Sequence, residues 1–388
     1  MILVGIDVAK DKHDCYICHS NGAVIKDSFS FDNNRGGFDL LLSFLPDSSD
    51  NVKVGLEATG HYSLNLINFL VENGFNPVIF NPLQINLFRK AHTLRKTKTD
   101  KIDAKLIALM LSASDAKPHL GLSYHILELK SLTRYRFRLK EQLSKLKVSI
   151  SRIVNIIFPE LESCVYSINQ KSTLAMLKCF PSKKLIAYAH LTKLTNVLKS
   201  NSRGKYGKDK AICIKTAAEN SIGSDSDAIS FELIQTIDLI DFYSSKIKEL
   251  EDKINMIMDK IQSPLMSIPG ISYTLASIIL AEIVDINRFD NDGQLLAFAG
   301  LDPGTHQSGK FVATGVSMVK RGSPYLRWAL LNAARLVAMR DETFALYYQK
   351  KKSEGKHHYV VLTHTARKLI RVIFKLLKDN CKFESQIN

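Results

Sequence analysis

The order of short apolar runs in the first 120 residues constrains the fold of this chain more than any other feature. Three runs, at 1–7, 14–20 and 23–31, read as strands, and Asn21-Gly22 between the last two is typical of a hairpin turn. The elements predicted after them are helix 36–45, strand 52–57, helix 62–73, strand 76–81 and helices 85–94 and 103–112. A meander followed by alternating helices and strands predicts an α/β sheet covered by helices.

This order is that of an RNase H-like (RuvC-like) domain, which we expect to end near residue 120. Beyond it, two apolar seams with heptad spacing predict a pair of long helices. The first seam consists of Leu132, Leu139, Leu143, Leu146, Ile150, Ile153 and Ile157, and the second of Ile247, Leu250, Ile254, Ile257 and Ile261. The helices form either a coiled coil between subunits or a bundle within one chain, with small helices and loops between them at 160–228. Residues 121–262 are thus predicted to be a helical linker and oligomerisation region.

The last predicted domain, residues 263–388, is mostly helical. In it, Pro269-Gly270-Ile271 precedes an apolar helix at 274–284, an arrangement that resembles a helix-hairpin-helix element. A plain αα-hairpin is the alternative interpretation. A basic amphipathic helix is predicted over 363–378. The predicted fold class is therefore multidomain, with an α/β domain, long coiled-coil helices and a mostly helical C-terminal domain.

The charge of the chain points to a polyanionic partner. Its 388 residues carry a formal net charge of +15, and 45% of them are hydrophobic, which is enough for sizeable cores. The first apolar stretch, 1–6, runs directly into charged residues and does not resemble a secretion signal. The longest apolar stretch, 273–286, contains Glu282 and Asp285 and is too short for a membrane span. We therefore expect a cytoplasmic protein that binds nucleic acid and no membrane.

One cluster of possible metal ligands lies in the second predicted strand. His13, Cys15, Cys18 and His19 have spacings found in haem-attachment and zinc motifs. Side chains alternate between the faces of a strand, so Cys15 and Cys18 should point to opposite faces. We interpret these residues as ordinary strand residues with reduced thiols.

Four acids carry the candidate catalytic chemistry. Asp7 and Glu57 end the apolar strands VGID and VGLE, and Asp100 and Asp103 lie three residues apart at the start of a helix, where both should project from one face. Converging carboxylates need a counter-charge, and oxygen ligands favour Mg²⁺ or Mn²⁺. Taken singly, each acid also fits a turn, a helix cap or an ion pair. Together they predict a divalent-metal site suited to phosphodiester chemistry.

Basic residues surround the last two acids and recur near residue 320. Those predicted to bind nucleic acid are Arg95, Lys96, Lys98, Lys101, Lys310, Lys320, Arg321 and Arg327. Beside metal-binding acids such residues suit a phosphate-binding surface, although a solvated charged face has the same composition. Tyr325 and Trp328, in the helix YLRWALLNAA, are interpreted as core residues, with stacking on a base as the alternative.

Motifs in both end regions resemble those of one protein family. GIDVAKD, LEATGHY and KTDKIDAKLIA are similar to the N-terminal motifs of the insertion-sequence one-ten family of DEDD transposases, which are bridge-RNA-guided recombinases. SIPGI, FAGLDPGTHQSGK, KRGSPYLRWALLNAA and HTARKLIRVIF resemble the second domain of that family. The resemblance covers residues 1–115 and 263–378.

The resemblance implies roles for particular residues. Asp7, Glu57, Asp100 and Asp103 match the metal-binding DEDD set of the family. Ser308, in HQSGK, matches the serine that attacks DNA and becomes covalently linked to it. A serine hydroxyl needs a metal or a base to act as a nucleophile, so the acids and the serine would have to work together.

The expected function is that of a transposase or site-specific DNA recombinase of an insertion sequence, which joins strands by Mg²⁺-assisted serine attack. The resemblance also implies DNA partners (element ends and target), a guide RNA and a homo-oligomer, either a dimer or a tetramer. Ser308 also suits a turn, and Ser317 and Ser323 are rival serines. One alternative function is an RNase H-like metal-dependent DNA junction nuclease without serine linkage. Another is a catalytically inactive DNA-binding regulator.

Overall fold

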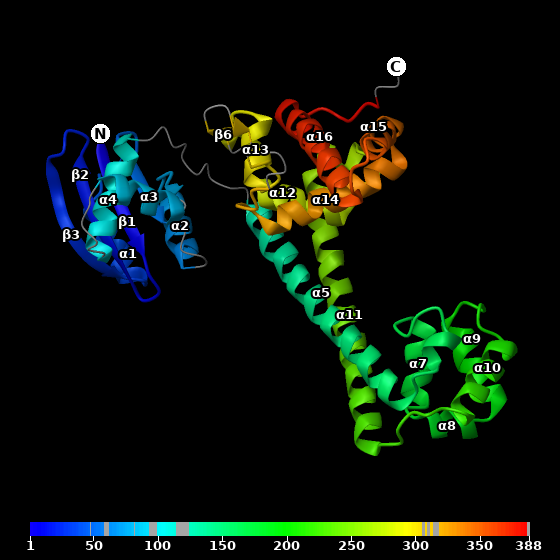
Figure 1. Ribbon diagram of the computed structural model, residues 1–388. Coiled ribbons are helices and arrows are strands. Elements are labelled where there is room, and N and C mark those ends of the chain that lie inside the picture. Colours follow the sequence, from blue (N-terminus) through cyan, green and yellow to red (C-terminus); the bar gives the residue numbers. More distant parts are fainter. Residues whose placement is uncertain are drawn as a thin grey trace. The chain divides into compact units, whose positions relative to one another are not determined.

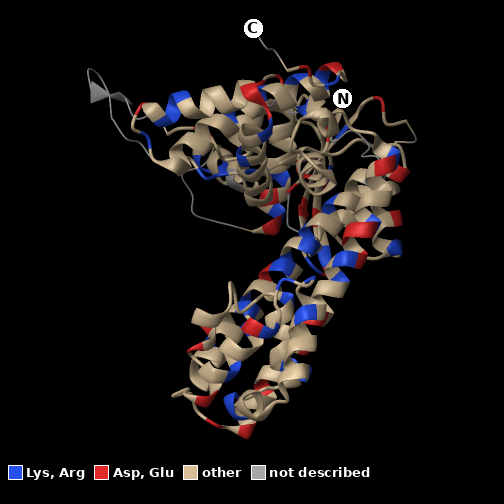
Figure 2. Cartoon of the chain, turned by 90° about the vertical axis from the view of Figure 1, so that its right-hand side faces the viewer, with Lys and Arg blue, Asp and Glu red and all other residues tan. Residues whose placement is uncertain are grey.

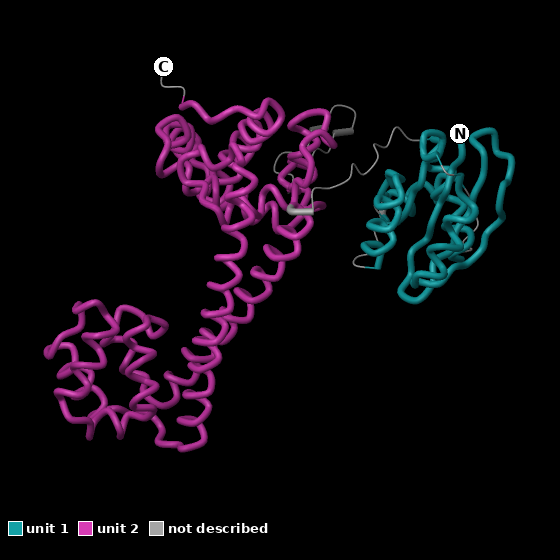
Figure 3. The backbone as a smooth tube through the Cα atoms, turned by 180° about the vertical axis from the view of Figure 1, so that it is seen from behind, with its two compact units in different colours: residues 1–123 teal, residues 124–388 magenta. Residues whose placement is uncertain are grey.

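The structure, a computed structural model, describes residues 1–46, 48–57, 62–80, 82–92, 99–113, 124–304, 307–308, 311–312 and 318–385. The chain folds into two compact units, Met1–Ser123 and Tyr124–Asn388 (Figure 3). The first unit contains a mixed sheet and the second is mainly helical, which confirms the predicted combination of an α/β part and a helical part. A further division of the second unit near residue 262 stays a prediction.

The first unit is built on one five-stranded sheet with the strand order β3-β2-β1-β4-β5 (Figure 1). Its strands are β1 (Ile2–Val8), β2 (Lys12–His19), β3 (Val24–Asp32), β4 (Val52–Glu57) and β5 (Val78–Phe80). β1 pairs antiparallel with β2 and parallel with β4, so the meander and the parallel strands meet at β1. Gly22, with φ of 90°, lies in the predicted turn between β2 and β3. This topology fits the RNase H-like fold.

Helices cover both faces of the sheet. They are α1 (Arg35–Leu42), α2 (Ser63–Glu72), α3 (Pro82–His92) and α4 (Asp100–Ala113). On one face Val4 and Ile6 of β1 pack with residues of α1 and α2, and on the other face Leu3 packs with residues of α3 and α4. Because side chains alternate along a strand, Gly5 and Asp7 share the face that α4 covers.

Gly5 lets α4 lie directly against β1. A Cβ at this position would stand 2.1 Å from the carbonyl oxygen of Ala104 and 2.5 Å from the backbone nitrogen of Ala108. Gly55, which pairs with Gly5 in the parallel ladder, would similarly press a Cβ against Leu111 of α4. Gly5 and Gly55 each lie two residues before a strand-end acid. They therefore permit the close approach of α4, the helix that carries Asp100 and Asp103.

The cysteines of β2 lie on opposite faces of the sheet. Cys15 belongs to the core under α1 and α2, whereas Cys18 belongs to the core under α3 and α4. Both thiols are buried, and burial together with Asp14 raises the pKa of Cys15 well above its ordinary range. His13 is also buried and packs against the rings of Phe31 and Phe38. The interpretation of Cys15 and Cys18 as strand residues that point to opposite faces is confirmed.

The second unit contains two long antiparallel helices with a group of shorter helices at each end (Figure 1). The long helices are α5 (Tyr124–Ile157) and α11 (Asp227–Ile261). Between them in sequence come α6 (Leu161–Cys164), α7 (Lys171–Cys179), α8 (Lys183–Tyr188), α9 (Leu191–Asn201) and α10 (Lys208–Glu219). The remaining elements are η1 (Pro264–Ser267), α12 (Tyr273–Ile283), η2 (Ile286–Arg288), α13 (Asp292–Phe298), β6 (Gln307–Ser308), β7 (Phe311–Val312), α14 (Pro324–Arg340), α15 (Glu342–Ser353) and α16 (His358–Asp379).

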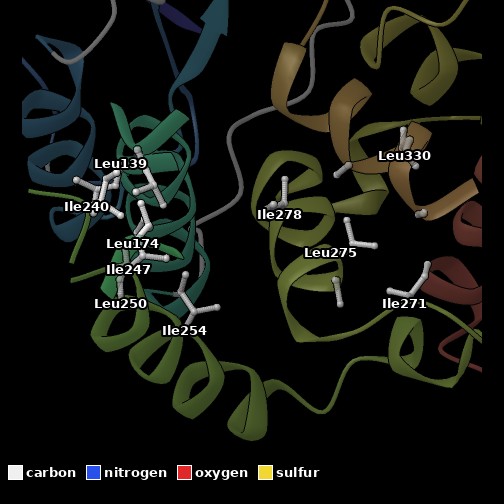
Figure 4. Packing of buried hydrophobic residues seen from close by; sticks show 14 of the residues in the cluster. Leu139, Leu174, Ile240, Ile247, Leu250, Ile254, Ile271, Leu275, Ile278 and Leu330 are labelled. Atoms are coloured by element: carbon white, nitrogen blue, oxygen red, sulfur yellow. The ribbon is translucent and has the colours of Figure 1, made fainter. Parts of the chain in front are cut away.

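The predicted apolar seams lie between α5 and α11. Leu139 of α5 is buried, as are Ile247, Leu250 and Ile254 of α11 (Figure 4). Leu143 of α5 is buried as well. Ion pairs between the helices flank this seam, including Arg136 with Glu251 at 2.6 Å and Arg152 with Glu232. Figure 2 shows that both charges are distributed along these helices. The two seams thus pair with each other within one chain, while their role between subunits stays a prediction.

The helices of the C-terminal end share one core with the long pair. Ile271, Leu275, Ile278 and Leu330 are buried close together in it (Figure 4). At the predicted helix-hairpin-helix turn, Gly270 has φ of 97° and would press a Cβ against the backbone of Leu336 in α14. This turn therefore packs closely on α14, and a role in phosphate binding stays a prediction. Among the described helices, none is long and apolar enough to cross a membrane.

Candidate active site

Strand pairing brings two predicted acids to the same end and face of the sheet. β1 and β4 are parallel neighbours with Ile6 opposite Leu56, so Asp7 and Glu57 follow at matching positions. Leu56 lies in the core under α1 and α2, and alternation therefore turns Glu57 toward the face that α4 covers, as for Asp7. The predicted strand-end placement of both acids is observed.

The other two acids lie in the first turn of α4, which begins three residues before the predicted start. Thr99 precedes the helix, and its Oγ1 accepts a hydrogen bond from the backbone of Ile102 at 3.4 Å. Asp103 is 2% exposed, whereas Asp100 is exposed to solvent. Arg89 of α3 forms an ion pair with Asp103, with its Nη2 2.9 Å from Oδ1. The two aspartates therefore differ in burial, although the sequence predicts that they project from one face.

A fifth carboxylate, which sequence reasoning missed, lies beside Asp7. Asp14 of β2 is the direct antiparallel partner of Asp7 and is 4% exposed. Its Oδ1 accepts a hydrogen bond from Ser30 Oγ at 2.7 Å. The signal was present in the sequence, because an antiparallel hairpin of strands 1–7 and 14–20 places Asp14 opposite the end of the first strand.

The pKa of Asp7 reflects its burial among these acids. Burial, followed by repulsion from Glu57, Asp103, Asp100 and Asp14, raises the pKa of Asp7 to about 7. Like charges that share a buried site disfavour ionisation in this way, and a cation relieves the repulsion. The donors are all oxygens, which suits a hard divalent ion. Within the described residues, however, no three such side chains are placed to hold a metal ion together.

The predicted serine lies in a segment whose two ends are joined by backbone pairing. We call residues 301–323 the serine-bearing segment. Asp302 accepts a backbone hydrogen bond from Val319 at 3.0 Å, and Pro303 forms a bridge with Met318. Within the segment, β6 and β7 pair, with Ser308 opposite Phe311. Ser308 is thus the last residue of its strand, and its side chain lies outside the described part.

Positively charged residues hold the ends of the serine-bearing segment. Arg327 Nη1 donates to the carbonyls of Ala299 at 3.4 Å and Lys320 at 3.3 Å. Arg367 Nε donates to the carbonyl of Leu301 at 3.0 Å. These bonds link α14 and α16 to both ends of the segment. Arg327, predicted to bind nucleic acid, therefore also has a structural role.

The rival Ser323 has a structural role in this arrangement. It precedes α14, and its Oγ accepts a hydrogen bond from the backbone of Leu326. The same hydroxyl donates to Oε2 of Glu282 at 2.7 Å. Glu282 is 1% exposed and receives two further hydrogen bonds from Arg134, at 2.7 and 2.9 Å. This network ties α5, α12 and α14 together, whereas the other rival, Ser317, lies outside the described residues.

A Glu282→Gln variant is expected to unfold with a free energy about 2 kcal/mol below that of the wild type, because Arg134 then loses its buried anionic partner. Burial would raise the pKa of Glu282, but hydrogen bonds from Arg134 and Ser323 outweigh it and lower that pKa. The stabilisation is therefore full above the ordinary value of 4.5 and is lost as the pH falls through the lower folded value.

Urea unfolding followed by the fluorescence of Trp328, which is the sole tryptophan of the chain, measures this difference. Glu249→Gln is the matched control, since its ion pair with Lys246 is exposed and should contribute less than about 1 kcal/mol. Equal stabilities of the Glu282→Gln and Glu249→Gln variants at neutral pH would contradict the role given to Glu282.

The predicted nucleic-acid contacts are distributed over both units. Lys101 is exposed in the first turn of α4, next to Asp100. Lys320 and Arg321 are exposed at the end of the serine-bearing segment. Four others lie outside the described residues, namely Arg95, Lys96, Lys98 and Lys310. The exposed cations are accessible to phosphate, and their binding role stays a prediction.

Comparison with protein families shows which family contains both the group of acids and the serine-bearing segment. Residues 4–159 match the model of the DEDD transposases of IS110, and residues 262–349 match that of the transposase IS116/IS110/IS902 family. The chain belongs to the IS110 family of transposases. The first match includes all four predicted acids, and the second includes the serine-bearing segment.

Individual relatives agree with this membership of the IS110 family. The chain is 24% identical to a pilin gene-inverting protein of Moraxella bovis over 390 residues, which cover 99% of this chain and 98% of that protein. It is 23% identical to an uncharacterized protein of insertion element IS116 from Streptomyces clavuligerus, over 98% of this chain and 96% of the other. It is 38% identical to the transposase for insertion sequence element IS1111A of Coxiella burnetii over 105 residues, or 27% of each chain.

Proposed function

We propose that this IS110-family transposase is a metal-dependent DNA recombinase that cuts and rejoins DNA strands through a serine nucleophile. The observation that carries the proposal is the gathering of acids around Asp7, whose pKa is raised to about 7 by burial and by repulsion from these acids. Perturbed carboxylates at the rim of a rigid sheet are typical of sites that act on phosphodiesters with divalent ions. The relative named as a pilin gene-inverting protein supports recombination as the type of reaction.

Asp7, Glu57, Asp100 and Asp103 are the residues proposed to hold Mg²⁺ or Mn²⁺. A bound divalent ion supplies positive charge that activates an attacking oxygen and stabilises the leaving oxygen. Arg89 helps to hold Asp103 in place through their ion pair, and Gly5 lets α4 approach β1 closely enough to bring the acids together. Lys101, exposed in the same turn of α4 as Asp100, is suited to bind a neighbouring phosphate.

Ser308 is proposed to attack the scissile phosphate. Its Oγ–P bond forms as the P–O bond to one strand end breaks, its hydroxyl proton is released, and the leaving oxygen takes up a proton. The covalent link keeps one phosphodiester bond, so a second DNA hydroxyl can reverse the step and join strands without ATP. The pinned ends of the serine-bearing segment support a defined position for this residue.

The proposed partners follow from family membership and charge. They are DNA at the element ends and the target, a guide RNA, and further copies of the chain in a homo-oligomer. The net charge of +15 suits nucleic-acid partners. Exposed Lys320 and Arg321, at the end of the serine-bearing segment, are the described cations placed best to contact DNA near Ser308.

DNA cleavage assays with and without divalent ions test the proposed activity. The protein, with element-end DNA and RNA transcribed from the flanking region, should cut in Mg²⁺ or Mn²⁺ and remain inactive with chelator. Binding of DNA without any cleavage in either metal would favour the inactive regulator instead. Cleavage that releases only free DNA ends would favour the junction nuclease.

A further inference from the structure

A pocket between α5 and α14 is lined by basic and aromatic residues that belong neither to the group of acids nor to the serine-bearing segment. Its volume is about 440 Å³, which is sufficient for one nucleotide. Its lining includes Arg136, Phe137, Lys140, Glu141, Lys145 and Trp328. Basic and aromatic side chains therefore meet in one pocket, which is the combination that single-stranded nucleic acid requires.

Trp328 differs from its predicted role as a core residue. Its neighbour Tyr325 packs against the core, but Trp328 remains 39% exposed. Phe137 contacts both rings nearly at right angles, with centroids 5.1 Å from Tyr325 and 5.8 Å from Trp328. These contacts fix the indole at the pocket while leaving part of it accessible. A partly exposed, oriented indole is suited to stack on a base.

Two lysines of the pocket are available to bind an anion. Arg136 is occupied, because its Nε and Nη2 both donate to Glu251 at 2.8 and 2.6 Å. Among the contacts of the described residues, the ammonium groups of Lys140 and Lys145 have no hydrogen-bond or ion-pair partner. Glu141 offsets one of these charges. The pocket therefore keeps a net positive charge beside the exposed indole.

We propose that this pocket binds an unpaired nucleotide of a single-stranded nucleic acid, with its base on Trp328 and its phosphates on Lys140 and Lys145. The proposal rests on the proposed function in taking nucleic acid as the partner, but it requires neither metal nor cleavage. Trp328 lies five residues after Ser323 on α14, so the nucleotide is held in the unit that carries Ser308. Binding here would fix a strand near the serine-bearing segment.

The fluorescence of Trp328 tests the proposal directly, because no other tryptophan contributes to the signal. Full-length protein in chelator is titrated with twelve-nucleotide single strands of RNA or DNA and with a DNA duplex. Saturable quenching by a single strand, and weaker quenching by the duplex, is expected. The RNA and DNA titrations identify which strand the pocket prefers. Absence of saturable quenching by both single strands would overturn the proposal.

Variants separate the pocket from the general positive charge of the chain. Lys140→Ala with Lys145→Ala should weaken single-strand affinity about ten-fold at low salt and lower the salt slope by about 1.4, or 0.7 for each phosphate contact. Lys199→Ala with Lys208→Ala removes the same charge from exposed positions of α9 and α10 and is the matched control. Equal losses in the two double variants would contradict the proposed phosphate site.

The contribution of the indole is measured with labelled oligonucleotides, since the variant lacks the intrinsic fluorophore. Trp328→Ala should weaken single-strand binding about ten-fold, and Trp328→Phe should recover most of it through the remaining ring. Unchanged affinity in Trp328→Ala would exclude stacking. These binding assays are made in chelator and do not depend on cleavage. If single strands bind but DNA is not cleaved when Mg²⁺ or Mn²⁺ is added, the proposed recombinase activity is contradicted and the nucleotide pocket is not.

Discussion

An Asp7→Asn variant is expected to lose metal-dependent DNA cleavage by about 10³-fold or more while its metal-free form becomes more stable. The amide removes the central charge of the acid group, so the proposed metal site is weakened. In the metal-free wild type the folded pKa of about 7 lies above the ordinary 3.8. Stability must therefore fall as the pH rises from about 4 to 7, and the loss stays complete above pH 7.

Thermal melting at pH 8, with and without Mg²⁺, measures both consequences. In chelator the Asp7→Asn variant should melt at a higher temperature than the wild type. Mg²⁺ should raise the melting temperature of the wild type more than that of the variant. Asp50→Asn, at an exposed position before β4, is the control and should change neither property. A variant that melts earlier than the wild type in chelator would contradict the crowding of charges at Asp7.

A Gly5→Ala variant is expected to lose about 1–3 kcal/mol of folding stability and about 10²-fold of cleavage activity. The added methyl group would stand 2.1 Å from the carbonyl oxygen of Ala104, so β1 and α4 must separate. This shift moves Asp103, which precedes Ala104, away from Asp7. The proposed metal site should therefore be damaged by a substitution that removes no ligand.

Urea unfolding and cleavage assays at a temperature where the variant is still folded separate the two effects. Gly36→Ala, in α1, is the matched control, since its nearest neighbour would be 3.6 Å from the new Cβ. That control should retain full activity and a similar or higher stability. A fully active Gly5→Ala variant would show that the position of α4 does not determine the site.

Local patterns were sufficient to predict the sheet and the acids on its strands. The alternation in VGID and VGLE, and the turn at Asn21-Gly22, indicate strands whose pairing follows from the RNase H-like order. The seam residues of α5 and α11 likewise follow from heptad spacing, because a helix that buries one face repeats its apolar residues. These features depend on residues close in sequence, and the structure contains them.

Contacts between distant residues could not be predicted in the same way. The ion pair of Arg89 with Asp103 depends on how α3 packs against α4, and the network of Arg134, Glu282 and Ser323 joins three separate helices. Trp328 lies in an apolar helix, a pattern that predicts a core residue. Its exposure depends on where α5 leaves α14 uncovered, which periodicity alone does not determine.

The most direct test of the account is a search for a covalent protein–DNA adduct on denaturing gels. The protein is incubated with Mg²⁺, element-end DNA and RNA transcribed from the flanking region, and wild type is compared with Ser308→Ala, Ser323→Ala and Asp7→Asn. An adduct in the wild type that is absent in Ser308→Ala and Asp7→Asn but retained in Ser323→Ala is the predicted result. Cleavage that persists in Ser308→Ala without any adduct would contradict serine attack and leave a water-using nuclease as the better account.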